Sequence, residues 1–217
     1  MIINIDEFVK SKILTDLNCI VISTNVFLEG GCIYNNTNKE DLGDMMSNIR
    51  RDEDVDKVRN NLFSLSKKSQ RILQIGVNAC HSCALFYHAN PDVDIVGFDL
   101  FNHEYTDPCT NYLSFNRRLK LKMIRGNTMD TLAGYNTAQK FDVIHVDGGH
   151  EIEVLRNDIE QCRRFANQYT YLVIDDTNLD NHQEIISECI AKNLIKEVDY
   201  DFEKLHSTPL HRIFHYL

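Results

Sequence analysis

Three acidic residues stand at the ends of two apolar segments in the second half of the chain. The segment FDVIHVDGGHE (141–151) contains Asp147, and the segment YLVIDDTN (171–178) contains Asp175 and Asp176, 28 residues further along. If both segments are neighbouring strands of a parallel sheet, their carboxyl ends share one edge of that sheet. Carboxylates placed so close together repel one another unless a cation neutralises them. Oxygen ligands of this kind favour a hard divalent ion such as Mg²⁺.

A histidine accompanies these carboxylates. His150 follows Asp147 by three residues, across a Gly-Gly pair and at the predicted start of a helix. An imidazole titrates near neutral pH, so His150 could act as a general base at the same edge of the sheet. The alternative is structural, because an Asp at a strand end can simply cap the following helix. Finding all four side chains in this arrangement favours the metal site.

The stretch RILQIGVNACHSCALFYHA (71–89) has two interpretations. In the first, a strand leads into a loop that binds a nucleotide-like cofactor, with Gly76 allowing close approach to the backbone and Asp99 accepting hydrogen bonds from ribose hydroxyls. The loop lacks the full Gly-x-Gly-x-x-Gly pattern of a pyrophosphate site, whereas S-adenosylmethionine carries no phosphate and a positive sulfonium. In the second interpretation, Cys80 and Cys83 form a redox Cys-x-x-C. They can also be two small side chains at the start of a buried helix.

From Arg71 onward, the chain alternates between short apolar segments and amphipathic ones. This alternation predicts a doubly wound α/β fold with a parallel sheet covered on both faces, and ligands beyond the carboxyl ends of its strands. So many strand–helix units disfavour a small thioredoxin-like domain. A last strand is expected at 210–217, and the alternation of Val198, Tyr200 and Phe202 predicts a half-exposed strand. The predicted strands are 71–76, 94–99, 120–124, 141–147 and 169–175, and the clearest predicted helices are 151–166 and 182–194.

Residues 1–69 differ in pattern from the rest of the chain. They are polar, and Val55, Val58, Leu62 and Leu65 recur at the spacing of one helix face. We therefore expect two parts: an N-terminal helical cap or lid at 1–69 and a Rossmann-like domain at 70–217.

Composition limits the partners of this 217-residue chain. Its net charge of −9 argues against a nucleic-acid surface, which needs clustered cations. No apolar run approaches the roughly 18 residues of a membrane span, and the acidic Asp6 and Glu7 are atypical of a signal peptide. Seven scattered cysteines fit a reducing compartment. We expect a cytoplasmic protein that binds neither nucleic acid nor membrane, whose apolar N-terminal residues could form a homo-oligomer.

Five segments carry a family resemblance: ILQIGVNACHS, VGFDL, RGNTMDTL, FDVIHVDGGHE and VIDDTN. Their order resembles that of class I S-adenosylmethionine-dependent methyltransferases, above all the metal-dependent O-methyltransferases of small molecules and sugars, over residues 70–178. The resemblance implies a Rossmann-like sheet that is mostly parallel, with an antiparallel C-terminal strand. It also implies methyl transfer from S-adenosylmethionine to a small-molecule or sugar hydroxyl. From the cluster of carboxylates, we expect Mg²⁺ to bind two neighbouring oxygens of the acceptor, as in a vicinal diol.

The same resemblance implies roles for individual residues. His150, which would deprotonate the acceptor, and Asp147 are the predicted catalytic residues. Residues predicted to bind the cofactor are Gly76, Asn78 and Ser82 along its length, Asp99 at the ribose, and Asn127 and Thr128 near the adenine. Residues predicted to bind Mg²⁺ are Asp147, Asp175 and Asp176.

Two positions depart from the family pattern. Cys80 stands where glycine is usual, and a Cβ there costs about 1–2 kcal/mol if the backbone needs a positive φ, which is about tenfold or more in cofactor affinity. Gln74 stands where Glu is common. These departures keep open a methyltransferase-fold binding protein with weak or no turnover. A thiol-disulfide oxidoreductase using Cys80 and Cys83 is the less favoured alternative.

Overall fold

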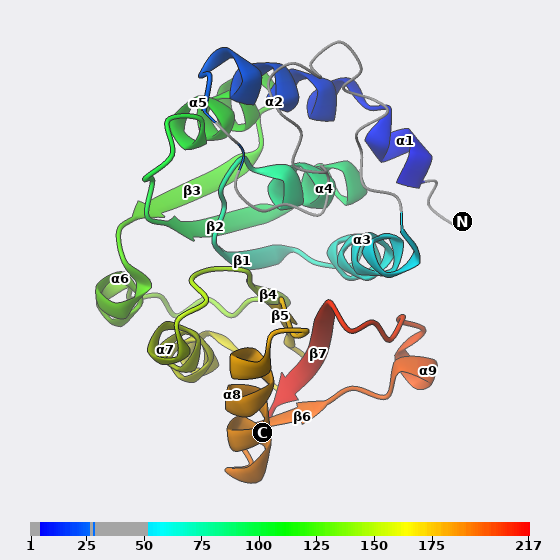
Figure 1. Cartoon of the computed structure of the whole chain (residues 1–217), viewed down its shortest axis with the longest axis vertical. Helices are drawn as coiled ribbons and strands as arrows, with labels where there is room; N and C mark the ends of the chain where they lie inside the picture. The colour runs from blue at the N-terminus through cyan, green and yellow to red at the C-terminus, as the bar shows by residue number, and fades with distance from the viewer. Residues whose placement is uncertain (1–4, 27, 29–51) are drawn as a thin grey trace.

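The computed structural model of the chain describes residues 5–26, 28 and 52–217. At its centre is one twisted sheet (Figure 1). Its seven strands are β1 (Arg71–Ile75), β2 (Asp94–Asp99), β3 (Lys120–Arg125), β4 (Val143–Val146), β5 (Tyr171–Asp175), β6 (Ile195–Glu197) and β7 (His211–Tyr216).

The strand order is β3-β2-β1-β4-β5-β7-β6. The pairs among β1 to β5 are parallel, and β7 runs antiparallel to both β5 and β6. The predicted doubly wound, mostly parallel fold with an antiparallel C-terminal strand is therefore confirmed. Four of the predicted parallel strands contain β1, β2, β4 and β5, the prediction at 120–124 ends one residue short of β3, and the predicted last strand contains β7.

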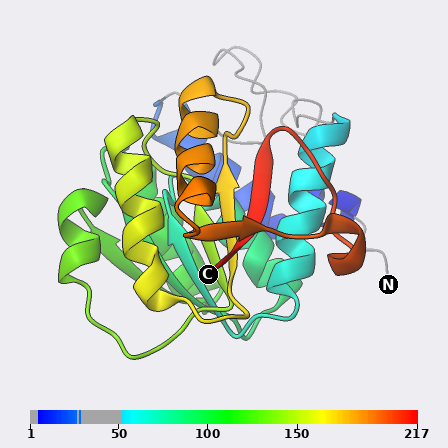
Figure 2. The same cartoon turned by 90° about the horizontal axis from the view of Figure 1, so that it is seen from below.

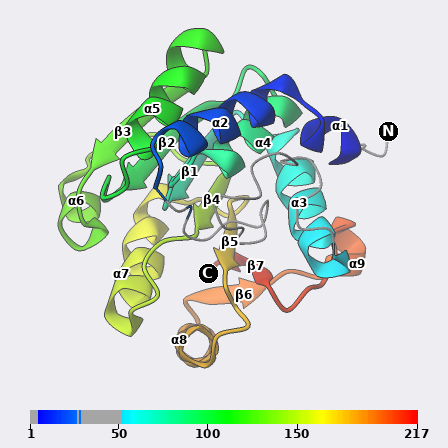
Figure 3. The ribbon, with the colours of Figure 1, turned by 45° about the horizontal axis from the view of Figure 1, so that its top comes forward.

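Helices cover both faces of the sheet (Figures 1 and 3). Strand side chains alternate between the faces, so Ile72 and Val143 enter the core beneath α4, whereas Leu73 and Ile144 enter the core on the other face. Apolar contacts on both faces explain the near-continuous apolar strands. The helices of the two layers are α3 (Glu53–Ser66), α4 (His81–Ala89) and α5 (Thr106–Asn111) on one face, and α6 (Thr128–Gly134), α7 (Ile152–Cys162) and α8 (Asp180–Ala191) on the other. Figure 2 shows α7 and α8 side by side.

The described N-terminal helices pack on the α4 side of the sheet. They are α1 (Ile5–Val9), α2 (Lys12–Ser23) and α3, and α2 contacts both α4 and α5. Leu14 of α2 and Leu62 of α3 share one apolar cluster with Phe86 of α4. The predicted helical face of α3 is thus buried, and the Asp52 side chain caps α3 by accepting from Val55 N at 2.9 Å. The division of the chain at residues 69 and 70 stays a prediction.

One predicted element is wrong. Val198, Tyr200 and Phe202 do not form a strand, because β6 ends at Glu197 and a short helix, α9 (Tyr200–Glu203), follows. The cause is local: the Asp199 carboxylate accepts from Phe202 N at 3.1 Å and caps the helix. The alternation of polar and apolar residues gave a false strand signal.

The other differences between the predicted and observed elements concern how helices end. The predicted helix 151–166 is α7 followed by a 3-10 turn, Arg163–Phe165, and α5 continues into a π-helical turn, Tyr112–Asn116. Among the described residues, no helix is both long and apolar enough to span a membrane. A cytoplasmic location, the absence of nucleic-acid binding and a homo-oligomer stay predictions.

Candidate active site

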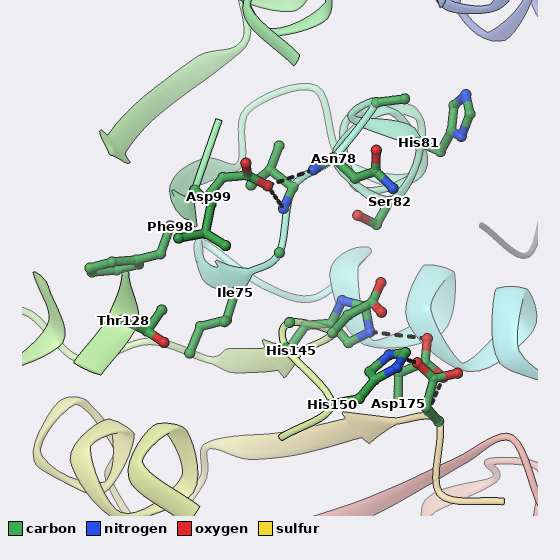
Figure 4. A pocket seen from close by; sticks show the side chains of 18 of the residues that line it. Ile75, Asn78, His81, Ser82, Phe98, Asp99, Thr128, His145, His150 and Asp175 are labelled. Atoms are coloured by element: carbon green, nitrogen blue, oxygen red, sulfur yellow. Dashed lines mark hydrogen bonds and ion pairs between the residues drawn. The ribbon is translucent and has the colours of Figure 1, made fainter. Parts of the chain in front are cut away.

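The carboxyl ends of β1 and β4 open into a pocket of about 1040 Å³. The chain leaves β1 toward β2 on one side of the sheet and reaches β4 on the other, and open α/β sheets bind ligands at such a point. All ten residues predicted for the site line this pocket: Gly76, Asn78, Ser82, Asp99, Asn127, Thr128, Asp147, His150, Asp175 and Asp176. Figure 4 labels Asn78, Ser82, Asp99, Thr128, His150 and Asp175 among them. The structure thus brings them together, and their roles toward ligands stay predictions.

The loop between β1 and α4 has an unusual backbone. Gly76, Asn78 and Cys80 all take positive φ, at 74°, 50° and 63°. Gly76 is required, because a Cβ there would lie 1.7 Å from the backbone oxygen of Asp147. Cys80 thus has the backbone conformation in which a Cβ was predicted to raise the free energy of the folded state. The result is a tight loop packed against the end of β4.

Asp99, at the end of β2, holds this loop in place. One of its carboxylate oxygens accepts from Val77 N and Asn78 N, both at 2.8 Å, and the other accepts from Phe101 N at 2.7 Å. Each carboxylate oxygen has two lone pairs, so Asp99 can still accept from a ligand. The backbone contacts were not predicted, and they make Asp99 a structural anchor of the pocket in its own right.

Asn127 and Thr128 lie where β3 leads into α6. Asn127 caps α6, since its side-chain oxygen accepts from Met129 N at 2.9 Å. Thr128 is buried and contacts Asp158 of α7, a fully buried carboxyl. Burial raises the pKa of Asp158 to about 6, and hydrogen bonds from Thr128 and Asn157 oppose part of that rise. Sequence reasoning missed Asp158, which lies within the polar part of the α7 pattern.

Three side chains meet at the other end of the pocket. Ligand atoms of His145, Asp147 and Asp175 all lie within 4.8 Å of one another, and Figure 4 shows His145 beside Asp175. His145 was not predicted, although the signal was present: it precedes Asp147 by two residues, and alternate residues of a strand share a face.

This cluster has the electrostatics of a cation site. Burial, with the charges of Asp175 and Asp176, raises the pKa of Asp147 well above its usual range. Burial and then the charge of Asp176 raise the pKa of Asp175 to about 7. Nε2 of His145 is buried without a hydrogen-bond partner. Two repelling carboxylates and an unused ring nitrogen fit a divalent metal ion.

Asp176 lies next to this cluster but is not part of it. It has a φ of 54°, and its carboxylate is 2.8 Å from Nε2 of His150. Both side chains are exposed at the pocket, His150 by 58% and Asp176 by 41%. The structure therefore pairs the predicted base with Asp176, and the predicted metal-ligand role of Asp176 stays a prediction.

Cys80 and Cys83 are fully buried. Burial raises the pKa of Cys83 to about 12 and that of Cys80 well above its usual range. A redox cysteine needs an accessible thiol with a lowered pKa. The geometry therefore does not favour a thiol-disulfide oxidoreductase.

A family model described as a methyltransferase domain matches residues 73–177. Solved structures of similar fold include the O-methyltransferase from Bacillus cereus in complex with SAH, at 12% identity and a TM-score of 0.66, over 96% of this chain and 91% of that chain. TomG from Streptomyces achromogenes, solved with SAM, has 12% identity and a TM-score of 0.60, over 94% and 88%. SAH-bound PaMTH1 from Podospora anserina has 13% identity and a TM-score of 0.59, over 77% and 83%. No curated protein sequence matches the chain.

The chain therefore carries a methyltransferase domain, and it has the Rossmann-like fold of the class I methyltransferases. The matched residues include all ten predicted site residues. The predicted family resemblance and the predicted enzyme class are confirmed, whereas the metal ion and the acceptor stay predictions.

The strain at Cys80 can be measured. We expect Cys80→Gly to be more stable to urea than Cys80→Ala by about 1 kcal/mol. Relief of the Cβ clash in this backbone conformation outweighs the extra freedom of glycine in the unfolded chain. Both variants remove the thiol, so their difference isolates the backbone. Equal stabilities, or a less stable glycine variant, would contradict the strain.

The buried carboxyl of Asp175 predicts a pH dependence in metal-free buffer. Its pKa rises from 3.8 to about 7 on folding, so the folded state holds the proton more tightly than the unfolded state. The stability that it contributes is present below pH 3.8 and falls as the pH rises toward 7. Asp175→Asn should flatten this fall in urea unfolding, and the exposed Asp92→Asn should keep it. If the stability of Asp175→Asn falls with rising pH as steeply as that of the wild type, the fall does not come from Asp175.

Proposed function

We propose that the protein transfers the methyl group of S-adenosylmethionine to a hydroxyl oxygen of a small molecule, with the help of a divalent metal ion. One observation carries the proposal: the cluster of His145, Asp147 and Asp175 lines the same pocket as the β1–α4 loop. A metal-bound acceptor and the methyl donor would thus be neighbours.

The cofactor half of the pocket supports an adenosyl ligand. The tight loop at Gly76 and Asn78 lets a ligand lie against backbone, and Asp99 is placed at the end of β2, where ribose hydroxyls bind in sheets of this type. Thr128 and Phe98 line the far end of the same pocket (Figure 4). SAM or SAH is bound by the similar structures from Streptomyces achromogenes and Bacillus cereus.

The acceptor half supports a metal-binding diol. Asp147 and Asp175 would hold the metal ion, which we predicted to be Mg²⁺. When bound, such an ion orients two adjacent acceptor oxygens and lowers the pKa of a hydroxyl. A vicinal diol, in a sugar or another small molecule, presents two oxygens at the required spacing.

The pair of His150 and Asp176 would supply the base. The carboxylate of Asp176 would accept a hydrogen bond from Nε2–H of a neutral His150, which leaves the lone pair of Nδ1 to accept the proton of the acceptor. The deprotonated oxygen then bonds to the methyl carbon as the bond from carbon to sulfur breaks. Most of the rate acceleration would come from holding both reactants in line.

Cofactor binding can be tested by thermal unfolding with S-adenosylmethionine. A concentration of 100 times Kd should stabilise the wild type by about 2.7 kcal/mol and raise its Tm. Ser82→Trp should lose this shift, because its indole fills the pocket. Ser187→Trp, on the exposed side of α8, should keep it. A wild type that shows no shift at millimolar cofactor would favour a fold that has lost cofactor binding.

Metal dependence can be tested by cofactor-dependent methyl transfer to a panel of catechols, sugars and other diols. EDTA should abolish turnover, and added divalent ion should restore it. Asp175→Asn should lower metal-stimulated turnover by at least about tenfold, whereas Asp92→Asn should not. Full activity in EDTA would reject the metal role, and cofactor binding without turnover on any acceptor would favour a binding protein.

A further inference from the structure

His145 is a buried histidine with one nitrogen that the protein leaves unused. Its side chain is 1% exposed, and Nδ1 lies 2.7 Å from Oε1 of Gln74. Nε2 has no hydrogen-bond partner and lies 3.9 Å from the carboxylate of Asp175. The ring is held edge-on against Phe86, with 6.0 Å between ring centres. Both the position and the tilt of this imidazole are thus determined by the fold.

Gln74 determines which nitrogen of His145 carries the proton. Nε2 of Gln74 donates to the backbone oxygen of Gly76 at 2.7 Å, and a backbone oxygen can only accept. The amide oxygen of Gln74 must therefore face His145, so Nδ1 of His145 is the donor. A neutral ring protonated at Nδ1 carries its lone pair on Nε2. Gln74 and His145 are direct neighbours in the register of β1 and β4.

That lone pair is directed at groups that are also electron donors. Nε2 of His145 lies 3.9 Å from the carboxylate of Asp175, and ligand atoms of His145, Asp147 and Asp175 all lie within 4.8 Å of one another. Three donors facing each other without a proton or cation between them are unfavourable. A metal ion shared by all three resolves this, and the hydrogen bond from Nδ1 to Gln74 is the kind of outer contact that orients a histidine ligand.

We propose that Nε2 of His145 is a metal ligand, and that the site therefore prefers a first-row transition ion such as Mn²⁺ or Co²⁺ over Mg²⁺. Mg²⁺ prefers oxygen ligands, whereas imidazole nitrogen suits the transition ions. The inference rests on the proposed binding of a metal ion by Asp147 and Asp175. Gln74 is then a positioning residue, which accounts for an amide where the family pattern has an acid: a carboxylate could not donate to Gly76.

The test uses the metal-free full chain titrated with Mn²⁺ and with Mg²⁺ by calorimetry. Pulsed electron paramagnetic resonance of the Mn²⁺ form detects a directly bound nitrogen. We expect tighter binding of Mn²⁺ and a nitrogen coupling in the wild type. His145→Asn should abolish the coupling and lower the preference for Mn²⁺ over Mg²⁺ by at least about tenfold.

The matched control is the double variant His150→Asn/His182→Asn. It removes two other histidines near the cluster, of which His182 contacts the backbone oxygen of Asp175. The coupling should persist there, which supports the proposal even if His145→Asn fails to fold. A coupling that survives in His145→Asn, or is lost in the double variant, overturns it. Equal binding of Mg²⁺ without nitrogen coupling overturns the inference alone, whereas a wild type that binds neither ion overturns the proposed metal role as well.

Discussion

The repulsion between the carboxylates of Asp147 and Asp175 is the constraint on which the site depends. The parallel pairing of β4 and β5 places both groups at one edge of the sheet, and burial strengthens their repulsion. A folded protein tolerates such a pair by keeping a proton on it or by binding a cation. The raised pKa of Asp175 is the response of the metal-free chain, and a bound metal ion is the alternative that would also be useful for chemistry.

The rest of the pocket depends on the backbone that surrounds this pair. Gly76 allows the β1–α4 loop to pass against the backbone of Asp147, and Asp99 fixes that loop by accepting from two of its backbone amides. A donor bound along the loop is then next to any acceptor held at the carboxylates. Cys80, whose backbone is strained, belongs to the same turn. The surrounding structure therefore holds the loop at the edge of the sheet despite an unfavourable local backbone conformation.

Much of this could be predicted from the sequence, for identifiable reasons. Strands buried on both faces have continuous apolar sequences, and Asp147 and Asp175 end two of them, so topology alone placed the two carboxylates together. His145 was missed because alternation along a strand gives the face that a histidine shares with Asp147 but not what its ring nitrogens contact. Its contact with Gln74, which lies 71 residues earlier in the chain on the neighbouring strand β1, is visible only in the structure. The false strand at Tyr200 had a different cause, since a helix cap overrode the alternating pattern.

The central claim is that one pocket holds a metal ion and the methyl donor side by side. Crystals grown with Mn²⁺ and S-adenosylhomocysteine test it most directly, through an anomalous difference map at the manganese absorption edge. The account predicts one strong peak in contact with Asp147 and Asp175, next to a ligand lying along the loop from Gly76. Manganese at another position, or a ligand in this pocket with no ion beside it at saturating Mn²⁺, would contradict it.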